Sequence, residues 1–500
     1  AWSLMVSYNL LRGEHCCHND LLLNKILKEE WGFDGAVVSD WGGIHDTRQA
    51  ALNGADIEMG TNKPYDEYYM ADAMAELFRS GEVPMEVLDD KVRRVLRLNM
   101  RTAMNRNRPW GSFNSPEHTA LAREVAEQGI VLLKNEGNLL PLNTEKFRSV
   151  AVIGENATRV HAGGGGAAKV KARYEITPLE GIRTRFGDKV KVNYAMGYCS
   201  YTPLADRVIP EPYDNAELKK EAVAVAAASD VVLFIGGLNH NRYQDSEAFD
   251  RASYELPYGQ EELLEAILDV NENVVLVLVS GTAVDLSFAG GIPAIVQGWY
   301  GGSEAGNALA AVLAGDVNPS GKLPFSFPAR LEDCGAHAFG PEAYPGIDLK
   351  EVYKDDILVG YRWYDTKGIE PLYAFGHGLS YTSFAYGKPK TDKSFYGKDG
   401  TVKLSFDVTN TGPVDGAEIS QVYVSQSKAS VMRPVKELKG FAKTFLRAGE
   451  TRRVEIELPV SEWAFWDEAG AGWVVEPGEF VLHVGAASDD IRHSVSVDVK

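Results

Sequence analysis

Two acidic segments hold carboxylates at places where a fold could expose reactive groups. The first is Val38-Ser39-Asp40-Trp41-Gly42-Gly43, which follows the apolar run Gly35–Ser39. A continuous apolar run is typical of a parallel strand that is buried on both faces, so Asp40 is expected at the C-terminal edge of a sheet, where barrel folds carry their catalytic groups. Trp41 places an apolar ring beside this anion, as a sugar ring with developing positive charge would require. Alternatively, Asp40 is the N-cap of the next helix.

The second segment is Asp245-Ser246-Glu247-Ala248-Phe249-Asp250-Arg251, in a loop after the apolar strand that ends at Gly236-Gly237. Several carboxylates beside one arginine allow one acid to stay ionised while the pKa of another is shifted upward. The alternative is a solvated charged loop, which is what most charge runs are.

Two further motifs resemble ligand sites only superficially. Gly163–Gly166, followed by Lys169, lacks the Gly-Lys-Ser/Thr ending of a phosphate loop, so a loop that lines a site fits better. His15-Cys16-Cys17-His18 has metal-ligating residue types, but four successive residues cannot converge on one tetrahedral ion. We therefore predict no metal site.

The elements that must position these groups begin with alternating strands and helices over residues 1–105. Helices are expected after a cap at Asn19 or Asp20, from Asp46 to Gly54, and from Pro84 through Met104. The expected strands are Leu4–Ser7, Gly35–Ser39 and Ala55–Met59. Three such units fit a parallel α/β fold.

A second α/β region follows the polar, turn-rich stretch Asn105–Asn114, beginning with a helix from Ser115-Pro116 to Gln128. Further helices are expected over Asn215–Ala228 and Gln260–Val270. The expected strands are Ile130–Leu133, Ser149–Ile153, Val190–Tyr194, Asp230–Gly236, Val274–Ser280 and Ala294–Gln297.

The C-terminal part changes character. Residues 335–395 are rich in Gly, Pro, Tyr and Asp with little periodicity, which indicates an extended connector. From Gly400 the apolar residues alternate with period two, for example over Val402-Leu404-Phe406-Val408, and turn signals such as Pro477-Gly478 separate the runs. This pattern predicts a small antiparallel β-sandwich.

Composition narrows the class of protein. Five hundred residues suggest about three domains. A net charge of −19 disfavours nucleic acid and anionic membrane as partners. Four cysteines make no disulfide framework, and no stretch approaches the roughly 18 apolar residues of a transmembrane helix. The chain begins at Ala1 with no initiator Met, so it leaves localisation open.

Taken together, ordered motifs over essentially the whole chain resemble the glycoside hydrolase family 3 β-glucosidases and β-xylosidases. The motifs are Met5-Val-Ser-Tyr8-Asn9, Glu30-Trp-Gly-Phe-Asp-Gly35, Ser39-Asp40-Trp41-Gly42, Gly54-Ala-Asp56-Ile-Glu58-Met59, Gly129-Ile-Val-Leu-Leu-Lys-Asn135, Leu139-Leu-Pro-Leu142, Gly163–Gly166, Glu247-Ala-Phe-Asp250-Arg251, Asp316-Val-Asn-Pro-Ser-Gly-Lys-Leu-Pro324, Tyr361-Arg-Trp-Tyr364, Phe375-Gly-His-Gly-Leu-Ser-Tyr381 and Glu437-Leu-Lys-Gly-Phe441.

The resemblance implies a fold that combines α/β and all-β parts. We expect the C-terminal portion of a (β/α)8 barrel over 1–105, a linker over 106–120, an α/β sandwich over 121–335, a connector over 336–395 and a fibronectin type III-like domain over 396–500. A whole (β/α)8 barrel takes about 250 residues and eight units. The chain supplies three, so we expect a missing segment or a second polypeptide to complete the barrel and to carry the Asp, Arg and Lys-His groups that hold the sugar in this family.

The resemblance also implies the site. Asp40 would be the catalytic nucleophile and Glu247 the general acid/base, while Met5, Tyr8 and Trp41 would line the sugar site. A retaining mechanism needs the two carboxyl groups about 5–5.5 Å apart and no cofactor. The chain departs from the family at Ala248, where glycine is usual, and at Gly166, near the place of a serine that contacts the sugar.

The expected function is therefore a retaining exo-acting β-glycosidase, in the first place a β-glucosidase, acting on a β-linked oligosaccharide or glycoside. The alternatives are a β-xylosidase, a non-catalytic carbohydrate-binding or assembly subunit, and a phosphorylase or transglycosylase that uses the same nucleophile.

Overall fold

The computed structural model describes all residues from 1 to 500 except 61, 165, 201–212 and 248. Within these residues the chain divides into two compact units, Ala1–Phe113 and Asn114–Lys500. No helix in the described part of the chain is both long enough and apolar enough to cross a membrane.

The first unit is built on short parallel strands. β1 (Ser3–Val6) pairs with β4 (Ala36–Ser39) in parallel, and Val38 makes one further parallel bridge to Ile57. The strand predicted over Ala55–Met59 is therefore reduced to a single bridge. The remaining elements are β2 (Leu10–Leu11), β3 (Glu14–His15), the 3-10 segments Cys16–His18 and Tyr65–Glu67, a π-helical segment (Leu21–Glu30), α1 (Thr47–Leu52), α2 (Asp72–Arg79) and α3 (Met85–Arg101).

Local signals explain where these helices begin. The Asp46 side chain accepts a hydrogen bond of 2.7 Å from the backbone N of Gln49 and so caps α1. Pro84 precedes α3, where its missing N–H costs no hydrogen bond. These two predicted starts are confirmed. The 3-10, π and short α segments pack around a core that includes Leu23, Val37 and Met74.

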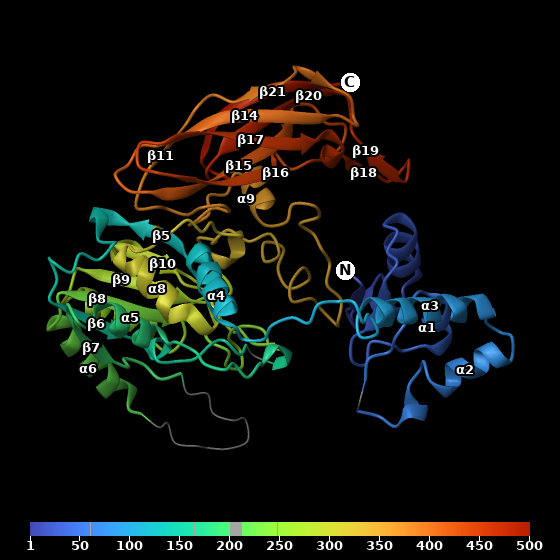
Figure 1. Ribbon diagram of the computed structural model, residues 1–500, viewed down its shortest axis with the longest axis horizontal. Coiled ribbons are helices and arrows are strands. Elements are labelled where there is room, and N and C mark those ends of the chain that lie inside the picture. The colour runs from blue at the N-terminus through green and yellow to red at the C-terminus, as the bar shows by residue number, and fades with distance from the viewer. Residues whose placement is uncertain (61, 165, 201–212, 248) are drawn as a thin grey trace. The chain divides into compact units, whose positions relative to one another are not determined.

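The second unit contains a six-stranded sheet in the order β5-β10-β9-β8-β6-β7 (Figure 1). All neighbouring pairs are parallel except β5 with β10, which is antiparallel. The strands are β5 (Val131–Asn135), β6 (Ser149–Ile153), β7 (Lys191–Ala195), β8 (Val231–Gly237), β9 (Val274–Val279) and β10 (Ala294–Gln297). The six strands predicted here are confirmed to within one or two residues at each end.

Helices cover both faces of this sheet, and alternate residues along a strand therefore pack in two different cores. Phe234 and Leu276 pack in one core with residues of α6 (Asn215–Ala227) and α7 (Gln260–Leu268). Leu233 and Val275 pack in the other core with residues of α5 (Pro178–Phe186) and α8 (Ala305–Ala314), and α4 (Pro116–Gly129) contacts α8. Strands buried on both faces need the continuous apolar runs that the sequence shows.

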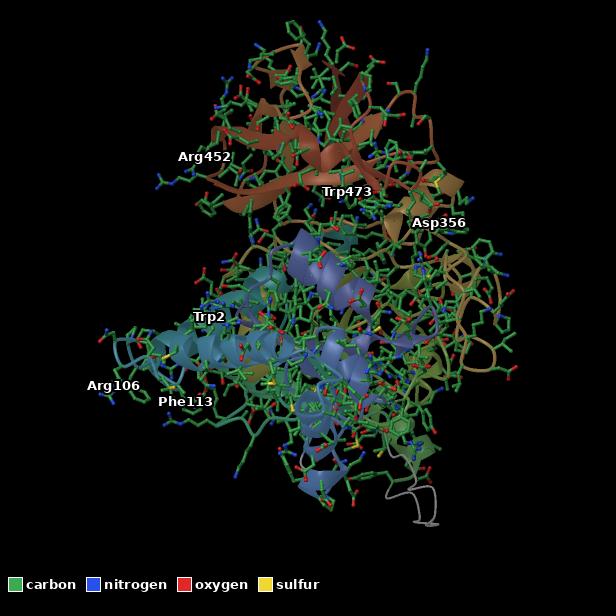
Figure 2. The ribbon with its side chains drawn as sticks, turned by 90° about the vertical axis from the view of Figure 1, so that its right-hand side faces the viewer. Trp2, Arg106, Phe113, Asp356, Arg452 and Trp473 are labelled. Carbon is green, nitrogen blue, oxygen red and sulfur yellow. The ribbon has the colours of Figure 1, made fainter. Side chains whose placement is uncertain are left out.

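A β-sandwich forms the C-terminal part. One sheet joins β11 (Phe384–Tyr386), β14 (Thr401–Asn410), β12 (Lys390–Thr391) and β17 (Thr451–Pro459). The other joins β13 (Phe395–Tyr396), β21 (Ile491–Val499), β20 (Gly478–Gly485), β15 (Gly416–Gln426) and β16 (Glu437–Leu446). A separate hairpin consists of β18 (Phe465–Asp467) and β19 (Gly472–Val474). Figure 2 labels two exposed side chains of this part, Arg452 on β17 and Trp473 on β19.

Between α8 and β11 the chain has little regular structure apart from a 3-10 segment (Leu331–Asp333) and the short helix α9 (Tyr361–Lys367). The connector predicted over 336–395 extends too far, because β11 and β12 within that range belong to the sandwich. Trp363 and Tyr364 of α9 are buried in a small cluster with Leu358. The connector therefore has a core of its own.

Candidate active site

Asp40 lies where the sequence predicted it, directly after β4. Its backbone N donates to the carbonyl of Val6 in β1 at 3.0 Å, which continues the parallel ladder by one residue. The Asp40 side chain is partly exposed and does not cap a helix, because Asp46 caps α1. The alternative role of Asp40 as the helix cap is therefore wrong. Its carboxylate accepts a hydrogen bond of 2.6 Å from the backbone N of Trp41.

A tight turn after Asp40 depends on two glycines. Gly42 has φ +67°, a conformation that residues with a Cβ adopt at a cost, and the Gly43 N donates to the Asp40 carbonyl at 3.1 Å. A Cβ at Gly43 would collide with the Sγ of Cys17. This thiol is buried and donates to the carbonyls of Val6 and Ser7, each at 3.3 Å, and burial raises its pKa. The Cys17 side chain thus packs against the turn and leaves no room for a side chain at Gly43.

The predicted sugar-binding residues are exposed at the same sheet. Met5 stands on β1 opposite Val38 of β4, Tyr8 follows β1 by two residues, and Trp41 follows Asp40. Their exposed fractions are 57%, 62% and 53%, which is high for large apolar side chains. Carboxyl ends of neighbouring parallel strands meet at one edge of a sheet, so Tyr8 and Asp40 share that edge.

The histidine and cysteine cluster is a packed structure. Cys16 and Cys17 are buried, and the His15 ring stacks on His45 with centroids 3.7 Å apart. Among the described residues, no three His, Cys, Asp or Glu side chains are placed to hold a metal ion.

In the second unit, the predicted acid/base Glu247 is exposed in the loop after β8. Its Oε2 accepts a very short hydrogen bond from the backbone N of Ala167, which immediately follows the glycine run. A Cβ at Gly166 would collide with this carboxylate. The glycine loop therefore contacts the predicted acid/base, as a loop that lines a site would. Ala248 and Gly165 lie outside the described residues.

The rest of the acidic segment is not a free charged loop. The Asp245 carboxylate accepts hydrogen bonds from the Gly281 N at 2.7 Å, the Thr282 hydroxyl at 3.1 Å and the Tyr300 hydroxyl at 2.8 Å. Burial, followed by the charge of Asp245, raises the pKa of Tyr300, so this phenol stays protonated and donates. The alternative of a solvated loop is therefore wrong for Asp245.

These contacts come together because four parallel strands end at one edge. The glycine loop follows β6, the acidic segment follows β8, Gly281 and Thr282 follow β9, and Tyr300 follows β10. Open α/β sheets bind ligands beyond the carboxyl ends of their strands, so this edge is where a site is expected.

Sequence reasoning missed a histidine at the same edge whose ring nitrogens are buried. His161 lies before the glycine loop and, with Arg159 and Tyr300, lines a cavity of about 30 Å³. Both ring nitrogens are buried without a partner. Burial, then the charges of Arg159 and His240, lower its pKa to about 3, so the ring is neutral near pH 7. A lone histidine beside glycines gave no signal of this burial.

Comparison with protein-family models covers most of the chain. Residues 2–98 match the glycosyl hydrolase family 3 N terminal domain, residues 130–381 the glycosyl hydrolase family 3 C-terminal domain, and residues 418–488 a fibronectin type III-like domain. The chain belongs to glycosyl hydrolase family 3. The predicted family, its combination of α/β and all-β parts, and the class of glycoside hydrolase are thereby confirmed.

Relatives within the family match the whole chain. It is 48% identical over 514 residues to beta-glucosidase BoGH3A of Bacteroides ovatus and 38% identical over 498 residues to thermostable beta-glucosidase B of Acetivibrio thermocellus. Both alignments cover 100% of this chain, which spans 68% and 63% of the two relatives.

Solved structures of the family superpose on the chain as well. The GH3 beta-glucosidase of Bifidobacterium adolescentis is 35% identical with a TM-score of 0.88, and the match covers 100% of this chain and 69% of that one. DesR, a beta-glucosidase of Streptomyces venezuelae in complex with D-glucose, is 29% identical with a TM-score of 0.91, and the match covers 100% and 76%.

Proposed function

We propose that the protein is a retaining exo-acting β-glucosidase that releases terminal β-D-glucose from β-linked glycosides. The observation that carries the proposal is Asp40 at the carboxyl end of β4, released from any capping role and followed by the exposed Trp41. The names of the two relatives, both beta-glucosidases, support the same substrate class.

The two carboxyl groups have complementary roles in this proposal. Asp40 attacks the anomeric carbon, so a glycosyl–enzyme ester forms as the bond to the leaving oxygen breaks. Glu247 gives its proton to that oxygen and then takes a proton from the water that hydrolyses the ester. Met5, Tyr8 and Trp41 bind the sugar, with the Trp41 ring packed on its apolar face. No cofactor takes part in these steps.

The domain division belongs to the same proposal. Residues 1–105 form the C-terminal portion of a (β/α)8 barrel, 106–120 the linker, 121–335 the α/β sandwich, the residues from 336 to the start of β11 the connector, and the chain from β11 to residue 500 the fibronectin type III-like domain. The matched ranges 2–98, 130–381 and 418–488 support these assignments. The completion of the barrel by further residues stays a prediction.

The test is Asp40→Asn, measured on an aryl β-glucoside with the protein as its source organism makes it. We expect turnover to fall by at least about 10⁴-fold, because the amide is a poor nucleophile. Asp46→Asn is the matched control, since an Asn still caps α1 and turnover should stay within about twofold. Turnover that survives Asp40→Asn would refute the assignment of the nucleophile.

Product analysis separates the alternatives. NMR of the first product should show β-glucose, and an α anomer would exclude the retaining mechanism. Added phosphate should leave the product unchanged, whereas a phosphorylase would give glucose 1-phosphate. A protein that binds glycosides without turnover would be a carbohydrate-binding subunit.

The choice of sugar needs a panel of glycosides. One relative, 36% identical over 504 residues, is named exo-alpha-(1->6)-L-arabinopyranosidase, from Bifidobacterium longum. The panel therefore includes aryl β-xyloside and aryl α-L-arabinopyranoside, and we expect the β-glucoside to have the highest kcat/KM.

A further inference from the structure

The segment that carries Glu247 is fixed on both sides to one turn. Two residues before Glu247, the Asp245 carboxylate accepts from the Gly281 N and from the Thr282 hydroxyl. Gly281 and Thr282 follow β9, whose six residues are all buried. The turn therefore continues a fully buried strand, while Gly281 and Thr282 themselves are exposed.

Four residues after Glu247, Arg251 binds the same turn. One of its terminal nitrogens donates to the Thr282 hydroxyl at 2.8 Å and to the Ala283 carbonyl at 2.6 Å. Its other terminal nitrogen donates to the carbonyls of Ser253 and Tyr254 at 3.2 and 3.1 Å. The guanidinium is thus held from several sides.

The Thr282 hydroxyl links Asp245, before Glu247, to Arg251, after it. The Thr282 hydroxyl donates its only proton to Asp245 and accepts from Arg251, so the three side chains form a chain of two hydrogen bonds. Both bonds have a charged partner, and such bonds are about twice as strong as neutral ones. The Tyr300 hydroxyl gives Asp245 a third donor, from the end of the next strand.

Glu247 lies in a turn. Ser246 and Phe249 make an isolated antiparallel bridge with Glu247 inside it, and the Arg242 guanidinium lies 4.0 Å from the centroid of the Phe249 ring. Glu247 itself is exposed, and its carboxylate accepts a hydrogen bond from the Ala167 amide. Its position thus depends both on this contact and on where the two ends of the segment are held.

We propose that Asp245, Thr282 and Arg251 form a clamp that positions Glu247 for proton transfer. The proposal rests on the proposed role of Glu247 as the general acid/base. A general acid must lie within hydrogen-bond reach of the leaving oxygen, and small misplacements lower the rate of proton transfer. The three clamp residues are positioning residues and do not touch the substrate.

The test uses Thr282→Val, which removes the hydroxyl at nearly constant volume, and Thr282→Ser, which keeps it. We measure kcat/KM and the pH–rate profile for phenyl and 2,4-dinitrophenyl β-glucoside. Phenolate needs a proton to leave, whereas dinitrophenolate does not. Thr282→Val should lose about 10- to 100-fold on the phenyl glucoside and less than about threefold on the dinitrophenyl glucoside. Thr282→Ser should stay near the wild type on both.

Glu247→Gln is measured in parallel and should show the same dependence on the leaving group at larger amplitude. If it does and Thr282→Val loses activity equally on both substrates, the clamp is only structural and the inference is overturned. If Glu247→Gln itself shows no such dependence, the assignment of the acid/base is wrong, and the clamp's role in catalysis is wrong with it.

A second variant keeps the test decisive if Thr282→Val does not fold. Tyr300→Phe removes one of the three donors to Asp245 and leaves the Thr282 bridge in place. We expect a loss of about 3- to 10-fold confined to the phenyl glucoside. No difference between the two glucosides would count against the clamp.

Discussion

The imidazole of His161, with both ring nitrogens buried, should make the second unit sensitive to acid. Its pKa is lowered to about 3, first by burial, then by Arg159 and His240, while an unfolded histidine titrates near pH 6.5. A lowered pKa in the folded state means that the unfolded state binds more protons between these values. The free energy of unfolding therefore falls as the pH drops below about 6.5.

The size of the effect follows from the shift. From pH 6.5 to 4.5 the folded imidazole stays neutral while the unfolded one is protonated, and each pH unit changes the free energy by about 1.4 kcal/mol. His161 should thus cost roughly 3 kcal/mol of stability at pH 4.5 relative to pH 7.5. Replacement by Phe removes this titration, and the cavity of about 30 Å³ beside the ring can take part of the larger side chain.

The assay is guanidinium unfolding of the wild type and of His161→Phe at pH 7.5 and 4.5. The difference between the free energies of unfolding at pH 7.5 and pH 4.5 should be about 3 kcal/mol smaller in the variant than in the wild type. The control is Val160→Ala, at the neighbouring exposed residue that lines the same cavity. This variant should change the free energy of unfolding by the same amount at both pH values. Identical pH dependence in His161→Phe and the wild type would mean that the charged ring is solvated or paired, and would refute the reasoning.

Two further predictions concern the first unit. Gly43→Ala should destabilise the protein by about 1–3 kcal/mol and lower turnover, because the added Cβ collides with the Cys17 thiol. Adding Cys17→Ala should restore most of the lost stability and most of the lost turnover. If thermal unfolding and kinetics show that the losses of the two single variants simply add in the double variant, the collision is not the cause. Lys91 donates to the Ala50 and Ala55 carbonyls, and its pKa is lowered to about 8, above all by burial. Because the unfolded lysine keeps its proton to higher pH, the free energy of unfolding should rise by roughly 2–3 kcal/mol between pH 8 and 10. Unfolding measured across this pH range should show the rise in the wild type and not in Lys91→Met.

Elements with a strong local signal were predictable from the sequence. The buried strands β8 and β9 are continuous apolar runs, and the caps Asp46 and Ser115 mark helix starts. α8 was missed because AGNALAAVLA is buried almost throughout and has no polar face, so it lacks the period of an amphipathic helix. α5 was missed although Thr177 and Glu180 form a capping box at its start.

The candidate site divides in the same way. Asp40 and Glu247 stand in motifs, and Asp40 also follows an apolar run, so the sequence alone allowed both to be proposed as catalytic residues. Nothing local distinguishes Thr282 from any other loop threonine. Its role depends on the sheet order, which puts the ends of β8 and β9 side by side and so brings a residue 37 positions from Asp245 against that carboxylate.

That dependence explains why the acidic segment was easy to misread as a solvated loop. A run with three carboxylates and one arginine normally stays in water, because ordering exposed ion pairs gains little. Here the Asp245 carboxylate and the Arg251 guanidinium both hydrogen-bond to the hydroxyl of Thr282, an exposed residue three positions after β9. The loop is thus ordered by its hydrogen bonds to residues at the end of the sheet. For this reason Glu247 can remain exposed while its position is fixed.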